Sequence, residues 1–204
     1  MSLPRSSHGD FLRSRRPGGG IVPVLIALLS LLATPSVQAR PPALPPMAAQ
    51  GTVEVLFTPW DDAERALLRV IGQARRTIHI QAYTFSSRNI GWALGEAKKR
   101  GVQIEMLTDR EQAARNEHSL VHALHDSGIA IWYEVRYAAA HNKVMIIDGE
   151  DPEPVLVTGS YNFTFSAQAR NAENLLIMRG NPQLAKAYLD NWWRHRHDAV
   201  PYSR

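Results

Sequence analysis

Hydrophobic and polar positions between residues 53 and 198 follow two periodicities in turn. Short apolar runs rich in β-branched residues predict strands, whereas an apolar residue at every third or fourth position predicts an amphipathic helix. The stretch Asp61–Arg75 has the helical pattern, and it starts with Asp61 and Glu64 at the spacing of a capping box. The two patterns alternate along the chain, so strands and helices are expected to alternate as well.

The predicted elements define a fold class. The predicted strands are Val53–Phe57, Thr77–Phe85, Val102–Thr108, Ile129–Val135, Val144–Ile147, Val155–Val157 and Asn174–Met178. The predicted helices are Asp61–Arg75, Ile90–Arg100, Gln112–Ser127, Phe163–Ala169 and one that starts at Pro182. This alternation predicts an α/β fold, namely an α-β-α sandwich in which a mixed β-sheet is flanked by helices.

The first 39 residues have a different pattern. Four arginines precede an apolar stretch at residues 21–33, and Val37-Gln38-Ala39 fits a small-x-small cleavage site. These features predict a signal peptide over residues 1–39 that is cleaved after Ala39, and hence a periplasmic or secreted protein. The apolar stretch is short and contains Pro23, so we expect no stable membrane anchor. Export by the general or by the twin-arginine route is left open.

Charge and composition add three points to this picture. The chain has 23 basic and 19 acidic residues, but residues 1–39 hold four of the basic and one of the acidic ones. Residues 40–204 therefore carry a net charge near +1, and overall charge gives no support for a nucleic-acid partner. The absence of cysteine excludes disulfides. Residues 40–50 are rich in proline and alanine and predict a linker, followed by one domain over residues 51–204.

Candidate chemistry begins just before the apolar run Val144–Ile147. His141 and Lys143 are two positions apart, so on a strand their side chains project from the same face. Asp148 ends the run, and it lies an odd number of residues from Lys143, which places it on the opposite face and favours a structural role at the turn. An imidazole beside an ammonium is an arrangement that suits an anionic substrate.

A second group of polar residues follows the predicted strand Val155–Val157. Gly159-Ser160-x-Asn162 comes directly after it and offers hydroxyl and amide groups to an anion, and Asn171-Ala172-Glu173-Asn174 lies further on. His-x-Lys-x4-Asp followed by Gly-Ser-x-Asn resembles the phospholipase D superfamily, the HKD phosphodiesterases. The layout with one such motif and a downstream Asn-Ala-Glu-Asn is most similar to the bacterial endonuclease branch. The resemblance spans roughly Val53 to His197.

The resemblance implies a role for each residue of the motif. His141 attacks phosphorus and forms a phosphohistidine, while Lys143 and Asn162 hold phosphate oxygens. Ser160 is a weaker candidate for phosphate binding. Glu173 accepts a hydrogen bond from the His141 ring and leaves the other nitrogen free to attack. No metal and no cofactor is implied.

The reaction also needs a group that protonates the leaving oxygen. None of the other seven histidines is followed two positions later by lysine, so we expect a homodimer in which a two-fold axis brings both copies of His141 into one site. The expected substrate is DNA or RNA, cleaved to a 5′-phosphate. Two alternatives remain: a phospholipase D or cardiolipin-type lipid hydrolase, and a nucleic-acid-binding protein without activity.

Two further clusters have competing explanations. His118, His122 and His125 fall on one face of a predicted helix, which suits either a metal ion or, more often, a polar helix surface. Trp192 and Trp193, followed by Arg194-His195-Arg196-His197, suit either base stacking or packing of a terminal helix on the core, and packing is favoured.

Overall fold

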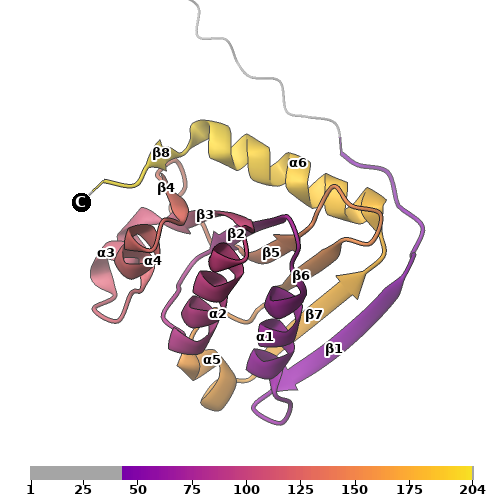
Figure 1. The fold of residues 1–204 in the computed structure, drawn as a ribbon, viewed down its shortest axis with the longest axis horizontal. Helices are drawn as coiled ribbons and strands as arrows, with labels where there is room; N and C mark the ends of the chain where they lie inside the picture. The colour runs from indigo at the N-terminus through magenta and orange to yellow at the C-terminus, as the bar shows by residue number, and fades with distance from the viewer. Residues whose placement is uncertain (1–42, 204) are drawn as a thin grey trace, which may run out of the picture. The chain divides into compact units, whose positions relative to one another are not determined.

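Eight strands form one sheet in the order β1-β7-β6-β5-β2-β3-β4-β8 (Figure 1). The computed structural model describes residues 43–203, so the predicted signal peptide lies outside the described residues. The strands are β1 (Thr52–Thr58), β2 (Thr77–Ala82), β3 (Gln103–Asp109), β4 (Ala130–Glu134), β5 (Lys143–Ile147), β6 (Val155–Gly159), β7 (Glu173–Arg179) and β8 (Val200–Pro201). β2 pairs with β3 and β3 with β4 in parallel, and all other pairs are antiparallel. The prediction of a mixed sheet is confirmed.

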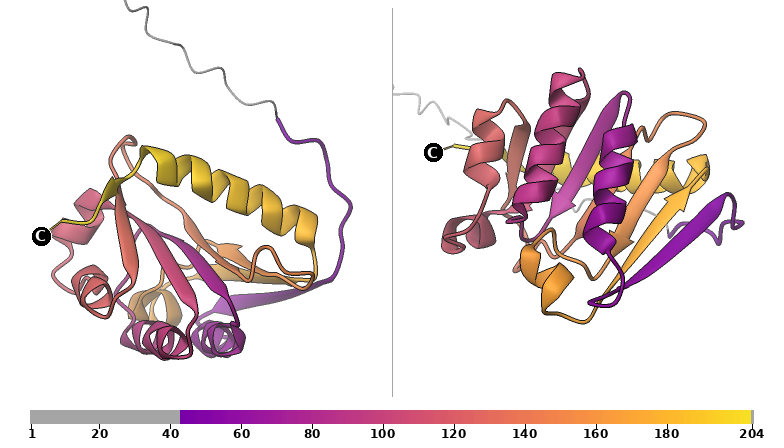
Figure 2. Two further views of the ribbon diagram at one scale, coloured as in Figure 1. Left: turned by 45° about the horizontal axis from the view of Figure 1, so that its top comes forward. Right: turned by 60° about the horizontal axis from the view of Figure 1, so that its bottom comes forward.

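Helices cover both faces of this sheet. They are α1 (Ala63–Gln73), α2 (Arg88–Lys99), α3 (Arg110–Arg115), α4 (Val121–Asp126), α5 (Phe165–Ala169) and α6 (Pro182–Asp198). α1, α2 and α4 lie on one face, and α6 crosses the opposite face alone (Figure 2). The predicted α-β-α sandwich is therefore confirmed for the unit Pro45–Arg204. No helix within the described residues is long and apolar enough to cross a membrane.

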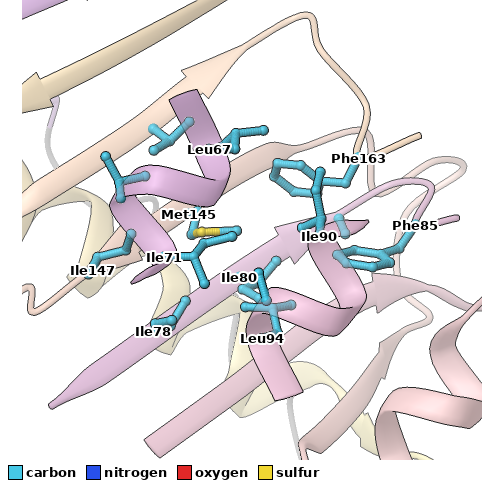
Figure 3. Close-up of a cluster of buried hydrophobic side chains, with 14 of the residues drawn as sticks. Leu67, Ile71, Ile78, Ile80, Phe85, Ile90, Leu94, Met145, Ile147 and Phe163 are labelled. Carbon is cyan, nitrogen blue, oxygen red and sulfur yellow. The ribbon is translucent and has the colours of Figure 1, made fainter. Parts of the chain in front are cut away.

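The alternation of side chains along β5 divides the core into two layers. Met145 and Ile147 pack with the cluster under α1 and α2, whereas Val144 and Ile146 pack with Leu189 and other residues under α6. Figure 3 shows part of the first layer, with these labelled residues from α1, α2 and neighbouring strands: Leu67, Ile71, Ile78, Ile80, Ile90, Leu94 and Met145. A strand that is buried on both faces reads as a continuous apolar run, which explains the sequence pattern of β5.

One predicted helix is wrong. Residues 112–127 form two short helices, α3 and α4, because the chain leaves the helical conformation at Asn116. The turn between them is fixed where the backbone N–H of Leu120 donates to the carbonyl oxygen of Phe85. His118 lies in this turn while His122 and His125 lie in α4, so the three histidines do not share one helix face. The strand predicted to end at Phe85 ends at Ala82, and Phe85 forms only an isolated bridge with Phe163.

The packing role predicted for the terminal helix is confirmed at Trp192. This side chain is fully buried, and its indole N–H donates to the carbonyl oxygen of Ile80 at 3.0 Å. His79 lies beside it on β2, with ring centroids 4.8 Å from Trp192 and 5.8 Å from Trp193. Burial lowers the pKa of His79, and the negative charge of Glu150 opposes this shift only in part.

Because its pKa is lowered in the folded state, His79 binds a proton more readily when the chain is unfolded. The free energy of unfolding should therefore fall as the pH drops through the unfolded pKa, by up to about 1 kcal/mol per pH unit. His79→Gln should flatten this slope between about pH 7 and about pH 5 in urea unfolding experiments. His197→Gln, at a largely exposed histidine, is the matched control. Equal slopes in wild type and His79→Gln would contradict the assignment.

Candidate active site

One edge of the sheet gathers the ends of several strands. Antiparallel register places Ala82 of β2 opposite Lys143 of β5, and Thr58 of β1 opposite Glu173 of β7. β6 ends at the same edge, since Gly159 pairs with Leu175. The sheet thus brings together three segments that sequence analysis singled out separately, around residues 141, 160 and 173.

His141 and Lys143 are in direct contact. The Lys143 Nζ lies 2.8 Å from the His141 Nδ1 and donates a second hydrogen bond to the His141 carbonyl oxygen at 2.9 Å. Lys143 is only 6 % exposed, while His141 is exposed. Because an ammonium can only donate, Nδ1 acts as an acceptor in this contact, so in the neutral ring the proton lies on Nε2.

Tyr83 forms the wall beside this pair. Its ring centroid is 4.3 Å from that of His141 and 4.9 Å from the Lys143 Nζ. Burial lowers the pKa of Lys143, and the negative charge of Glu173 partly restores it. Sequence reasoning missed Tyr83, because it follows an apolar strand and no motif marks it. The ammonium is thus held by a π face, a carbonyl oxygen and a nearby carboxylate.

Glu173 is tied to its own part of the chain. Its Oε2 accepts from the Ser160 hydroxyl at 2.5 Å, and its Oε1 accepts from the Asn171 side-chain amide at 2.9 Å. The backbone N–H of Asn174 donates in turn to the Ser160 hydroxyl oxygen at 3.0 Å. Within the part of the chain that the structure describes, no hydrogen bond joins Glu173 to His141. Ser160 therefore orients Glu173 in this arrangement.

Asn162 has an unusual environment. Its Oδ1 is buried and, among residues 43–203, has no hydrogen-bond partner. The adjacent helix α5 begins at Phe165 and is capped by the Thr164 side chain, so Asn162 is not its N-cap. A buried amide without a partner is rare in native structures, and it is able to satisfy a ligand after rotation about its last bond.

Asp148 stands at the far end of β5, away from this edge. Its carboxylate accepts hydrogen bonds from the backbone N–H groups of Arg75, Arg76 and Thr77, at 3.0, 2.8 and 3.0 Å. These bonds join the β5–β6 turn to the connection between α1 and β2. The residue itself has a positive φ of 50°. This geometry gives Asp148 a structural function.

The histidines considered for metal binding are placed differently. His122 Nδ1 lies 3.0 Å from the Tyr202 hydroxyl, and the ring of His125 packs on that of Tyr202 with centroids 4.5 Å apart. Over the described range, no group of three or more His, Cys, Asp or Glu side chains is arranged to hold a metal ion. His122 and His125 form a surface cluster with Tyr202, whereas the His118 ring lies beside Glu117.

Comparisons with known proteins give a consistent result. Residues 67–195 match the family described as cardiolipin synthase, PLD-like domain. A phospholipase D from Rickettsia typhi is 33% identical over 164 residues, which are 80% of this chain and 77% of that protein. A mitochondrial cardiolipin hydrolase from Mus musculus is 32% identical over 139 residues, which are 67% of this chain and 60% of that protein.

Solved structures show the same likeness at the level of the fold. Nuc from Salmonella typhimurium, a phospholipase D family member, superposes with a TM-score of 0.70 at 29% identity, covering 76% of this chain and all (100%) of that chain. NucT from Helicobacter pylori superposes with a TM-score of 0.68 at 21% identity, covering 75% of this chain and 100% of that one. At 21% identity, the similarity to NucT is evidence for a shared fold alone.

Proposed function

The chain belongs to the phospholipase D superfamily of phosphodiesterases, and from this premise we propose that it is an exported, metal-independent endonuclease acting on DNA or RNA. The contact between His141 and Lys143 carries the proposal. A phosphodiester is anionic, so a neutral nucleophile needs a fixed cation beside it, and the buried ammonium provides one. Export rests on the signal peptide predicted for residues 1–39.

The proposed reaction has two steps. A nitrogen of the His141 ring forms a bond to phosphorus, the bond from phosphorus to the 3′ oxygen breaks, and the leaving oxygen takes up a proton. Water then attacks phosphorus and gives a proton to the group that protonated the leaving oxygen, the phosphorus–nitrogen bond breaks, and the 5′-phosphate and the free His141 ring are released. As the substrate enters, Lys143 exchanges its hydrogen bond with His141 for one with a phosphate oxygen, and Asn162 holds another oxygen.

The proton donor and the orienting carboxylate complete the proposal. In a homodimer, the His141 of the second copy supplies the proton to the leaving oxygen. Glu173 accepts one ring N–H of histidine and leaves the other nitrogen free to attack. Within one chain its carboxylate is already oriented by Ser160 and Asn171, which supports a role as a fixed acceptor.

A lipid hydrolase is the second candidate. The relatives named phospholipase D and mitochondrial cardiolipin hydrolase favour it, because each is more than 30% identical to this chain (33% and 32%). The layout with one His-x-Lys motif followed by Asn171-Ala172-Glu173-Asn174, which resembles the bacterial endonuclease branch, favours the endonuclease.

The pH dependence of activity tests the assignment of Lys143. Because burial lowers its pKa, activity should decline on the alkaline side before the ordinary pKa of lysine is reached. Glu173→Gln removes the charge that raises this pKa, so the alkaline decline should move to lower pH. The rate is measured between about pH 7 and about pH 10, with Glu153→Gln, at an exposed carboxylate, as control. An unmoved decline would argue against the coupling of the two residues.

Cleavage assays with excess EDTA separate the candidates. Supercoiled plasmid, single-stranded RNA and cardiolipin vesicles are each incubated with the protein. Nucleic-acid cleavage that survives the chelator is the expected result. Loss of cleavage with EDTA would refute metal independence, and hydrolysis of cardiolipin alone would favour the lipid candidate. A salt-sensitive gel shift without cleavage would indicate a binding protein.

A further inference from the structure

A polar hollow of about 600 Å³ lies beside the candidate active site, enclosed by the first turns of α1 and α2, the turn between α3 and α4, and α5. Two segments of the chain lead from the site into its wall. Ser86 comes three residues after Tyr83, and Phe165 comes three residues after Asn162. Three residues span at most about 11 Å between Cα atoms, so the hollow begins within that distance of both parts of the site.

These two segments are fixed to each other. The backbone N–H groups of Ser86 and Ser87 both donate to the Phe163 carbonyl oxygen at 2.9 Å. The rings of Phe85 and Phe163 are buried, with centroids 5.8 Å apart (Figure 3). Because the segments are anchored in the core, the hollow is already formed and keeps its place relative to the sheet edge, as is usual for a ligand site.

The hollow combines an open aromatic ring with two guanidinium groups. Phe165 is 61% exposed, and the Arg170 guanidinium lies 5.7 Å from its ring centroid. Arg88 lines the hollow as well. Among residues 43–203, neither Arg88 nor Arg170 forms an ion pair, whereas Arg69 and Arg115 are examples of arginines paired with carboxylates. The two cations are therefore available to an anionic ligand.

Two carboxylates balance this charge, since Glu64 and Glu117 also line the hollow. The Glu64 carboxylate accepts from the Ser87 hydroxyl at 2.7 Å and from the Asn89 side-chain amide at 2.5 Å, which fixes it on the wall. A wall without net charge suits a neutral, flat and polar group whose own phosphates reach the arginines, and a nucleotide has this form. An acyl chain would require an apolar lining instead.

The same kind of surface continues along α2. A second hollow, of about 410 Å³, adjoins the first, since Arg88 and Leu120 line both. Trp92 lines this second hollow one helical turn beyond Arg88 and is 70% exposed. Gly95 lines it too, and a Cβ atom there would meet no atom of the described residues within 4 Å. Glycine is less favourable than alanine inside a helix, so packing does not explain Gly95, which keeps the space beside Trp92 open.

From these observations we infer that the two hollows bind single-stranded nucleic acid, with unpaired bases stacked on Phe165 and Trp92 and phosphates contacted by Arg170 and Arg88. We call these four residues the α2–α5 track. The inference rests on the proposed function, because the track holds the strand next to His141, which cleaves it. Aromatic rings that alternate with cations suit a single strand, since every base has a π face. The bases of a duplex are stacked on one another, so a duplex cannot use the two rings.

The test compares two substrates for each variant: a single-stranded DNA oligonucleotide, and methyl para-nitrophenyl phosphate, a small diester without a nucleobase. In Phe165→Ala and in Trp92→Ala, the ratio of kcat/KM for the oligonucleotide to that for the small diester should fall by about tenfold or more, because each ring stacks a base. The fall should be smaller when the same strand is annealed to its complement. Trp193→Ala is the matched control, since Trp193 is a 47% exposed tryptophan of α6, on the opposite face of the sheet. Thermal unfolding confirms that each variant is folded.

Replacing a cation tests the phosphate contacts. Fluorescence anisotropy of the labelled oligonucleotide gives the affinity in the His141→Ala background, which lacks the proposed nucleophile. Arg170→Gln should reduce the slope of log affinity against log salt concentration by about 0.7, the value for one phosphate of a single strand. Arg76→Gln is the control, because Arg76 is a largely exposed arginine at the opposite edge of the sheet, paired with Asp151. An equal slope in both variants would contradict the phosphate contact of Arg170.

Each outcome separates the track from the reaction. If wild type cleaves the oligonucleotide and the ratio is unchanged in Phe165→Ala and Trp92→Ala, the track is refuted and the proposed function stands. If wild type cleaves no nucleic acid, the proposed function fails, and anisotropy decides the track: about tenfold weaker single-strand binding in the two variants supports it, whereas equal binding or none overturns it. Hydrolysis of cardiolipin vesicles that falls in the two variants, with single-strand binding unchanged, would assign the hollows to a lipid headgroup and overturn the inference.

Discussion

Replacing His141 with alanine is expected to lower turnover by about 10⁴-fold or more, because removal of a nucleophile eliminates the covalent route and leaves only substrate binding and charge stabilisation. The fold should be unaffected. His141 is exposed, and among residues 43–203 the hydrogen bond of its side chain is with Lys143. The rate of plasmid or RNA cleavage is the measurement, and the thermal unfolding midpoint shows whether the protein is intact.

The matched control for this variant is His118→Ala. His118 is an exposed histidine in the turn between α3 and α4, and its ring lies 3.7 Å from the carboxylate of the neighbouring Glu117. Its replacement should leave the rate within about twofold of wild type. A His141→Ala protein that cuts as fast as wild type would end the phosphohistidine proposal. Equal losses in both variants would indicate a general effect on the fold.

Replacing Asp148 with alanine should lower the free energy of unfolding by about 3 kcal/mol or more. Three backbone N–H groups lose their charged acceptor, and each such hydrogen bond contributes about 1 kcal/mol or more. Alanine also tolerates the positive φ of 50° less well than aspartate. Asp148→Asn keeps an acceptor oxygen and tolerates this backbone conformation, so it should lose less.

Urea unfolding of the two variants, beside Asp151→Ala, measures this difference. Asp151 belongs to the same turn, but its ion pair with Arg76 lies at the surface, and such pairs contribute between zero and about 1 kcal/mol. A loss in Asp148→Ala no larger than that in Asp151→Ala would show that the three hydrogen bonds do not stabilise the turn.

The sequence predicted the fold because its signals are local. Period-two and helical patterns follow from which side chains are buried, and β5 is recognisable because both of its faces lie in the core. The split of residues 112–127 into two helices was missed, because the break depends on a hydrogen bond from Leu120 to Phe85, which is distant in the chain. The two-residue strand β8 is set by pairing with β4, and no local pattern marks it.

The same distinction between local signals and long-range contacts applies to the candidate site. His141 and Lys143 were predicted together, since two residues separated by one position must share a side of a strand. The contact of Tyr83 with both, and the bond between Ser160 and Glu173, depend on strand register. Gly159 shows why register is hard to predict, because a Cβ atom there would lie 2.3 Å from the Asn174 carbonyl oxygen. Only the folded sheet reveals so close an approach.

The pairing of β1 with β7 also sets the timing of folding during synthesis. β1 leaves the ribosome first, but within the described sheet its neighbour is β7, whose pairing partner Glu173 for Thr58 is made 115 residues later. At about 5–20 residues per second, the apolar strand waits roughly 6–23 s for its partner. During this interval Val53, Val55 and Phe57 are open to any other strand or to a chaperone. The β1–β7 pair thus closes late, and among the strand pairs of the described sheet only that of β4 with β8 depends on a segment synthesised afterwards.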